Sequence, residues 1–176
     1  KALMPDKPFF MYFAPGACHA PHHVPKDWIE KYKGKFDQGW DKLREETFAR
    51  QKKLGVIPAD AVLTARPDEI PAWDRTPENM RPIFAREMEV YAAFLEHVDH
   101  HVGRLVDTLK DLEILDDTLT YRISGDHRAS AEGTPNGCFN EMITLNGAAG
   151  LETPEFMASK IDDFGTPDAY NHYAVG

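Results

Sequence analysis

The longest regular pattern in the sequence is an amphipathic stripe between Thr76 and Leu112. Its apolar side chains recur at spacings of three and four residues, at Met80, Phe84, Met88, Tyr91, Leu95, Val98, Val102, Leu105, Leu109 and Leu112. This spacing places them on one face of an α-helix. Thr76 and Pro77 form a typical helix start, because threonine caps the first turn and proline already has a helical φ. The pattern predicts one long helix that buries a single face.

Two β-prone runs frame this helix. Residues 7–15 (KPFFMYFAP) form a short apolar and aromatic run, and residues 119–123 (LTYRI) lead into the loop 124–130. Continuous apolar runs of this length are typical of strands buried in a sheet. Helical patterns at 26–34 and 37–54 lie between the first run and the long helix. An order of strand, helices and strand indicates an α/β fold.

The loops that follow the two runs carry the candidate ligands. The first loop contains His19, His22 and His23 among prolines, which restrict the backbone and so hold the imidazoles in place. The second contains Asp126 and His127, whose oxygen and nitrogen could help hold a divalent cation. Loops at strand ends are where α/β proteins bind ligands. For both loops, ordinary surface polarity remains the alternative.

Two other sets of potential ligands carry weaker signals. His97 and His101 lie four residues apart on the predicted long helix, a spacing that could ligate a metal. They flank an apolar stripe without a matching acid motif, so we interpret them as ordinary helix residues. Cys18 and Cys138 are too few for a disulfide framework, and their spacing is not a zinc motif.

Charge and length limit the possible partners. The 176 residues carry a net charge of -9 with a pI near 5.3. Nucleic acid and anionic membranes attract clustered Lys and Arg, so neither is expected as the main partner. No run approaches the length of a transmembrane helix, and nothing indicates a compartment. The chain begins without methionine and stops within ordinary sequence, so we expect an internal piece of a longer protein.

The order of these motifs resembles arylsulfatases of the type I sulfatase family, in the alkaline phosphatase superfamily. The resemblance covers essentially the whole chain. Its motifs are Pro8-Phe9-Phe10-Met11-Tyr12-Phe13-Ala14-Pro15, His19-Ala20-Pro21-His22, Asp99-His100-His101-Val102-Gly103-Arg104-Leu105, Gly125-Asp126-His127 and Ala129-Ser130-Ala131-Glu132-Gly133. It implies a large α/β domain around a mostly parallel sheet flanked by helices. Residues 1–176 would be the central part of this catalytic domain, with the nucleophile region and the C-terminal domain outside them and the rest of the domain as their partner.

The resemblance also implies a chemistry, the hydrolysis of small-molecule sulfate esters. The family's nucleophile is a formylglycine made within a Cys/Ser-x-Pro-x-Arg motif. Neither Cys18 nor Cys138 lies in such a motif, so we expect the formylglycine outside this chain and no activity from these residues alone. Asp126 and His127 match a ligand pair for a divalent metal, calcium by preference, with Mg²⁺ or Mn²⁺ as alternatives. His19 matches the histidine that contacts sulfate, while His22 and His23 would support it.

Three residues depart from the family pattern. His127 stands where many relatives have Asn, and Arg128 stands where Gly is usual. Arg122 interrupts a strand expected to be buried on both faces, which costs stability unless the arginine is paired. Two alternatives therefore stay open. One is a phosphonate or phosphate ester hydrolase of the same superfamily, and the other is a non-catalytic, degenerate remnant that binds a metal or offers an interaction surface.

Overall fold

A computed structural model describes residues 4, 6–123 and 133–174. Regular structure in this part of the chain is helical, apart from two isolated bridges that pair Cys138 with His172 and Asn140 with Tyr170. The helices are α1 (Lys26–Glu30), α2 (Gly39–Leu54), η1 (Trp73–Arg75), α3 (Arg81–Asp111), α4 (Glu141–Leu145), η2 (Ala149–Leu151) and α5 (Pro154–Ser159).

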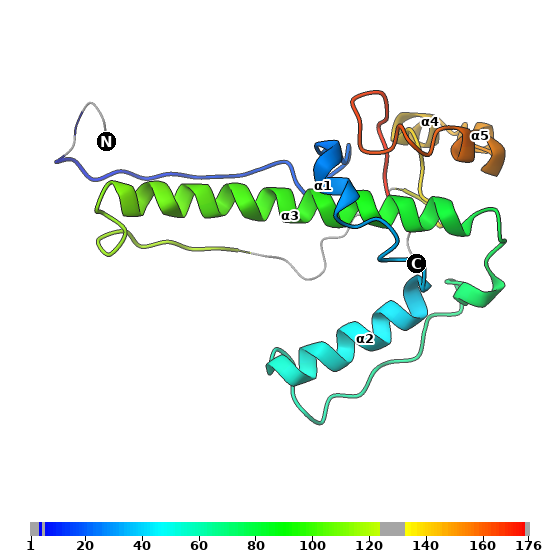
Figure 1. Cartoon of the computed structure of the whole chain (residues 1–176), viewed down its shortest axis with the longest axis horizontal. Helices are drawn as coiled ribbons and strands as arrows, with labels where there is room; N and C mark the ends of the chain where they lie inside the picture. Colours follow the sequence, from blue (N-terminus) through cyan, green and yellow to red (C-terminus); the bar gives the residue numbers. More distant parts are fainter. Residues whose placement is uncertain (1–3, 5, 124–132, 175–176) are drawn as a thin grey trace.

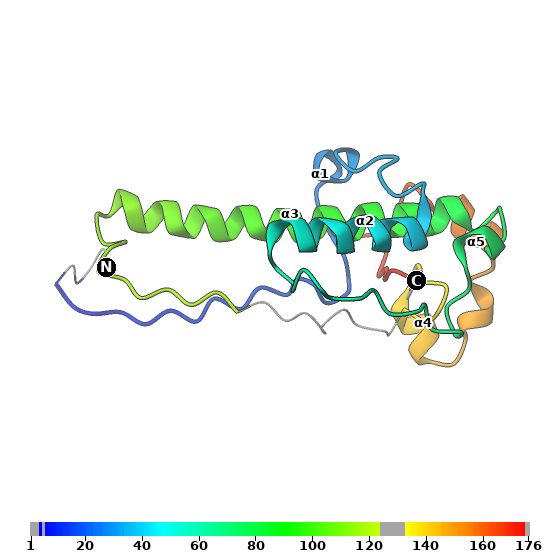
Figure 2. The same ribbon diagram turned by 90° about the horizontal axis from the view of Figure 1, so that it is seen from below.

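Helix α3 is the longest helix, and α1 and α5 pack against it, whereas α2 points away from it (Figure 1). Figure 2 shows the same arrangement from below. Helix α3 has 31 residues and carries Pro82 in its first turn, where a missing N–H costs nothing. The long helix predicted from the apolar stripe is confirmed, although it begins later than Thr76. Residues 77–80 instead form a turn, in which the Met80 N–H donates to the Pro77 carbonyl at 2.9 Å.

The hydrophobic core lies on the N-terminal half of α3. Helices α1 and α5 pack there, together with the chain between α5 and the last described residue (Figure 1). Ile29, Ile83, Val90, Met157 and Phe164 are each at most 2% exposed and belong to one cluster. Burying a side chain of this size contributes about 1.5–3 kcal/mol relative to leaving it exposed. This half of the molecule therefore carries most of the apolar stabilisation.

The two predicted strands do not form a sheet among the described residues. Residues 7–15 and 119–123 are extended and run alongside the C-terminal half of α3 (Figures 1 and 2), without a strand ladder. Phe10 and Ile123 are each 92% exposed, and Tyr12 is 84% exposed. A buried strand needs neighbours on both edges, and no other extended segment of the described chain lies beside these two.

The shorter helices follow local signals in the sequence. Helix α2 occupies nearly all of the predicted range 37–54 and ends at Gly55, which has a φ of 71°. Helix α5 begins at a local signal, because the Thr153 side chain accepts the Phe156 N–H and Pro154 fills the first turn. Thr153-Pro154-Glu155 predicts such a helix start and Gly165 a stop, but the helix already ends at Ser159. Across the described residues, we find no helix that is both long and apolar enough to span a membrane.

Candidate functional site

The histidine-rich loop after residues 7–15 turns into the core, and it places its three histidines differently. His22 is 0% exposed. His23 is half-buried, and its Nε2–H donates to the Ala169 carbonyl at 2.6 Å. His19 is exposed, and its Nδ1 lies 2.7 Å from the carbonyl of the next residue, Ala20. The sequence singled out His19, whereas the residue that the fold encloses is His22.

Four aromatic rings surround His22. The Tyr91 and Phe94 rings of α3 lie 5.3 and 5.7 Å from it, between centroids. The His172 ring lies 5.0 Å away, and Tyr173 stacks on it at 5.6 Å. Burial and the nearby His172 lower the pKa of His22 to about 3. The imidazole of His22 is therefore neutral at physiological pH.

Several polar atoms of this cluster have no hydrogen-bond partner of ordinary geometry within the described chain. They are both ring nitrogens of His22, Nε2 of His172 and the hydroxyl of Tyr173. The Nδ1–H of His172 donates to the Tyr173 carbonyl at 3.3 Å, so its Nε2 carries a lone pair. Leaving a buried polar atom unsatisfied costs about 1–3 kcal/mol. Such atoms are uncommon in folded proteins and, when they cluster, they indicate a place for a ligand.

Two tyrosines of the cluster are held in their neutral form. Burial, with a smaller effect of Cys18, raises the pKa of Tyr173 to about 12 and raises the pKa of Tyr91 further. Both hydroxyls therefore keep their protons at neutral pH and can donate hydrogen bonds. The cluster offers neutral donors and acceptors in a region of low dielectric, where polar interactions are stronger than in water.

Asp126 and His127 lie outside the described residues, so their role as metal ligands stays a prediction. The described chain resumes at Gly133, whose backbone lies against His172 so closely that a Cβ there would collide with its ring. Gly133, the first described residue after the predicted ligands, therefore lies beside the His22 cluster. Within the described ranges, no group of three or more His, Cys, Asp or Glu side chains could hold a metal ion.

A second polar cluster lies beneath the bridge at Cys138. Burial, with Glu152 and Glu87 nearby, raises the pKa of the Cys138 thiol to about 12. Glu87 is fully buried, which raises its pKa well above the usual value, and it accepts the Ala174 N–H at 3.0 Å. Glu152 accepts the backbone N–H groups of Phe139 and Asn140 at 3.0 and 2.7 Å. Because the thiolate is the reactive form, Cys138 is inert as a nucleophile.

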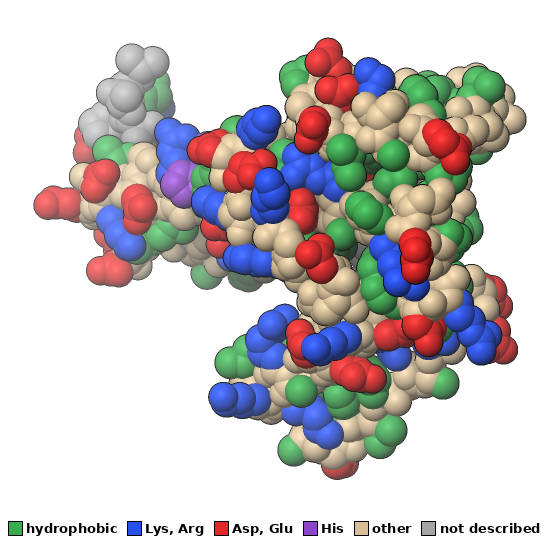
Figure 3. Space-filling model, turned by 45° about the vertical axis from the view of Figure 1, so that its right-hand side comes forward, with side chains coloured by type: hydrophobic (Ala, Val, Ile, Leu, Met, Phe, Trp, Pro, Cys, Tyr) green, Lys and Arg blue, Asp and Glu red, His purple; other side chains and the backbone are tan. Residues whose placement is uncertain are grey.

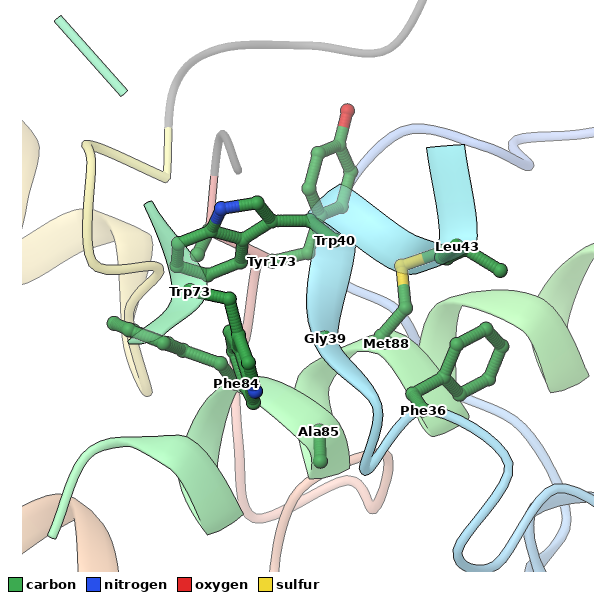
Figure 4. Close-up of a pocket in the computed structure, with 10 residues that line it drawn as sticks. Phe36, Gly39, Trp40, Leu43, Trp73, Phe84, Ala85, Met88 and Tyr173 are labelled. Atoms are coloured by element: carbon green, nitrogen blue, oxygen red, sulfur yellow. The ribbon is translucent and has the colours of Figure 1, made fainter. Parts of the chain in front are cut away.

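Two cavities lie beside the N-terminal half of α3, and the smaller one is also lined by Tyr173 of the His22 cluster. The smaller, of about 90 Å³, is lined by aromatic side chains of α2, η1 and α3, among them Trp40, Trp73 and Phe84 (Figure 4). The larger, of about 370 Å³, lies between Met80 and the turn 134–137 and also contacts Glu152. Neither contains a histidine, so neither offers acid–base chemistry like that of the His22 cluster.

Comparisons with known proteins agree with the sequence motifs. The Sulfatase family model matches residues 2–163. An uncharacterized sulfatase of Schizosaccharomyces pombe is 38% identical over 128 residues, which cover 72% of this chain and 22% of that protein. An arylsulfatase of Klebsiella aerogenes is 30% identical over 133 residues, which cover 76% of this chain and 28% of that protein.

The chain belongs to the sulfatase family, because the family model covers nearly all of it. The resemblance inferred from the motifs is thereby confirmed. Sulfatases are hydrolases of sulfate esters with an alkaline-phosphatase-like α/β fold, and the described residues form the helical part of such a fold but not its sheet. The chain spans about a quarter of the length of the two relatives, at 22% and 28%.

His22, His172 and Tyr173 form a cluster that sequence reasoning did not assemble. The motif at 19–22 indicates the loop as a candidate site, whereas the aromatic tail at 170–173 has a loop-like sequence without a recognisable motif. No local pattern connects the two, since they meet only when the chain folds back over α3 (Figure 1). The one available signal was the doubled histidine His22-His23 among prolines.

Proposed function

We propose that this chain is part of an arylsulfatase-type hydrolase that cleaves sulfate esters of small molecules. The observation that carries the proposal is the match of the Sulfatase family across residues 2–163, a range that includes both predicted ligand loops. The nucleophile would be a formylglycine supplied by residues outside these 176, because no Cys/Ser-x-Pro-x-Arg motif occurs among them. The chain's own contribution would be the histidine loop and the pair Asp126 and His127.

His19 is our first choice for the histidine that contacts the sulfate. Its ring is exposed, so a substrate can reach it, and the adjacent prolines restrict the loop. An imidazolium beside the leaving oxygen would donate a proton or stabilise the developing negative charge. Loss of such a group typically lowers the rate by about 10²–10⁴-fold.

His22 is the second candidate, because within the described chain its ring nitrogens have no hydrogen-bond partner of ordinary geometry, and it lies against His172 and Tyr173. An anionic sulfate placed beside it would favour the protonated ring and raise its pKa from the low value of the free site. In that case His22 would contact the sulfate, and His19 would lie at the mouth of the loop. The two assignments make different predictions for single substitutions.

Asp126 and His127 would hold a divalent metal together with ligands from the rest of the protein. Two side chains fill only part of the six to eight positions that Ca²⁺ takes, and its preferred donors are oxygens. The donor set therefore fits calcium at Asp126, while the imidazole of His127 also admits other divalent ions. Once bound, such an ion polarises sulfate oxygens. We propose calcium, with Mg²⁺ or Mn²⁺ as the alternatives to be measured.

The test is turnover by the intact protein that contains this chain, with an aryl sulfate and an aryl phosphonate offered side by side. We expect a preference for the sulfate and a loss of about 10²–10⁴-fold in kcat for His19→Ala. His100→Ala, on the exposed surface of α3, is the matched control and should keep full activity. An equal loss in His22→Ala alone would move the role to His22.

Two outcomes would overturn the proposal. His127, where many relatives have Asn, is the feature that favours a phosphonate or phosphate ester hydrolase, and a clear phosphonate preference would establish that activity instead. Absence of turnover on either substrate, in protein shown to carry formylglycine and metal, would indicate the non-catalytic alternative.

A further inference from the structure

His97 and His101 lie one turn apart on α3, away from the His22 cluster. Their Nε2 atoms face each other at 3.0 Å, and both side chains are half-buried. Trp28 of α1 packs edge-on against His97, with ring centroids 5.1 Å apart. Basic and acidic side chains are interleaved on the face of the molecule that Figure 3 shows. Because the two imidazoles are only half-buried, solvent and small ions can reach them.

The separation of the two nitrogens has a geometric meaning. Imidazole nitrogens bind divalent metals such as Zn²⁺ at about 2.0–2.1 Å, so two of them at right angles around one ion lie about 3.0 Å apart. In a tetrahedral site the same bonds would place them about 3.4 Å apart. The observed 3.0 Å matches neighbouring positions of a square-planar or octahedral ion. Cu²⁺ and Ni²⁺ prefer square-planar or tetragonal arrangements of nitrogen and oxygen ligands.

We propose that His97 and His101 form a two-histidine binding site for a divalent transition metal of the Cu²⁺ or Ni²⁺ class. Each Nε2 supplies one lone pair, and water completes the coordination, since within the described chain no third His, Cys, Asp or Glu joins the pair. The site is independent of the proposed hydrolase chemistry. It also differs from the proposed Asp126 and His127 site in both donors and metal preference.

In the structure, the contact of Arg104 with His101 favours the tautomer of His101 that cannot bind a metal through Nε2. The Arg104 guanidinium, which can only donate, lies 3.0 Å from Nδ1 of His101. His101 therefore carries its proton on Nε2 and donates it to Nε2 of His97. When a metal binds, that proton moves through solvent to Nδ1 of His101, and Arg104 turns away. Removing the guanidinium should consequently tighten metal binding.

The two imidazoles lie among charged side chains. Desolvation, with His97 and Arg104 nearby, lowers the pKa of His101. The carboxylates of Glu96 and Asp99 are engaged with cations, because Glu96 pairs with Lys31 at 3.2 Å and Asp99 pairs with Arg122 at 2.6 Å.

The experiment is calorimetric titration of the 176-residue chain with CuCl₂ and with NiCl₂, followed by electron paramagnetic resonance of the copper-loaded sample. The variant Asp126→Ala/His127→Ala is used as background, so that the other proposed metal site does not contribute. We expect one bound ion with two nitrogen ligands in the spectrum. His97→Ala and His101→Ala should each weaken binding at least tenfold and remove one nitrogen from the spectrum.

Two further variants make the result specific. His100→Ala is the matched control, because its ring lies 5.3 Å from that of His101 but does not join the Nε2 pair, and it should bind as the parent does. Arg104→Gln should bind several-fold tighter. Equal binding by the parent, His97→Ala and His101→Ala would overturn the proposal, as would a loss in His100→Ala of the same size. Circular dichroism melts establish that each variant is folded.

Discussion

The two halves of α3 have similar apolar stripes but different surroundings. On the N-terminal half, Ile83 and Val90 are fully buried under α1, α5 and the C-terminal residues. On the C-terminal half, Leu109 is buried, but Val98, Val102 and Leu105 are only half-buried, and Leu112 just beyond the helix is 52% exposed. The flanking segments differ in the same way, since Phe164 is fully buried and Phe10 is 92% exposed. An apolar stripe thus predicts which face of a helix is available for packing. Which part of that face is buried depends on the tertiary fold.

Substitutions in the core should separate the two halves most clearly. Ile83→Ala removes three buried carbons and leaves a cavity, so we expect a loss of about 2–5 kcal/mol in the free energy of unfolding. The matched change Ile123→Ala, at a side chain that is 92% exposed, should change it by less than about 0.5 kcal/mol. Urea unfolding followed by circular dichroism measures both. Similar losses in the two variants would refute the comparison.

A pair of glycines offers a second test. Gly137 and Gly55 both have positive φ, at 69° and 71°. A Cβ at Gly55 would meet nothing, whereas at Gly137 it would collide with the carboxylate of Glu87. Gly55→Ala should therefore lower the free energy of unfolding by about 1–2 kcal/mol, which is the penalty for placing a residue with a Cβ in a left-handed backbone conformation. Gly137→Ala should cost about 2–4 kcal/mol, because overpacking adds to the backbone strain.

The same urea series decides this second test. Equal losses of unfolding free energy in Gly55→Ala and Gly137→Ala would mean that the Glu87 side chain can move aside without a measurable loss of stability. That result would weaken the view that the N-terminal half of α3 is the tightly packed one. A larger loss at Gly55 would reverse the comparison.

The helices could be predicted from the sequence because their signals are local. The range of α2 follows from its pattern and from Gly55, and α5 follows from Thr153-Pro154. The strands could not be settled in this way, because residues 7–15 have the composition of a buried strand but a strand also needs neighbours. Composition cannot say where those neighbours lie, and the described residues do not provide them.

The candidate site also has a part that local sequence indicates and a part that only tertiary packing determines. The histidine loop stood out locally, as a set of imidazoles among prolines. The choice between His19 and His22 depends on Tyr91, His172 and Tyr173, which reach the loop only through tertiary packing. The sequence therefore indicates a candidate loop, and the fold distinguishes its exposed histidine from the enclosed one.

The pH dependence of stability should come from buried groups of the N-terminal half. The pKa of Glu87 is raised above 4.5 in the folded state, so the folded state binds more protons and stability falls as pH rises above 4.5. The pKa of His22 is lowered from 6.5 to about 3, so stability rises with pH between these values. The two effects oppose each other from pH 4.5 upward, and that of His22 ends at pH 6.5.

Glu87→Gln tests this assignment, since the amide still accepts the Ala174 N–H but does not titrate. Urea unfolding from pH 4.5 upward should show that stability falls more, or rises less, with pH in the parent than in the variant, because the effect of His22 is common to both. Glu45→Gln, at an exposed position of α2, is the control and should follow the parent. An unchanged slope in Glu87→Gln would mean that Glu87 is not the titrating group. The change should be smaller than the loss from a core cavity.

The smallest change in the free energy of unfolding is expected at the contact between the segment 119–123 and α3. Arg122 pairs with Asp99 at 2.6 Å, and the two side chains are 65% and 58% exposed. A buried strand position would have made an unpaired arginine costly, but this arginine is both paired and exposed. Exposed ion pairs contribute about 0.2–1 kcal/mol, because solvent screens the charges and two long side chains lose freedom.

A double-mutant cycle with Arg122→Ala and Asp99→Ala measures this contact. The coupling free energy should lie within about 0.2–1 kcal/mol at low salt and shrink in 1 M NaCl, where the Debye length is about 3 Å. A salt-independent coupling above about 2 kcal/mol would mean that the pair is screened from solvent. The C-terminal half of α3 would then be covered as firmly as the N-terminal half, and the contrast between the two would no longer hold.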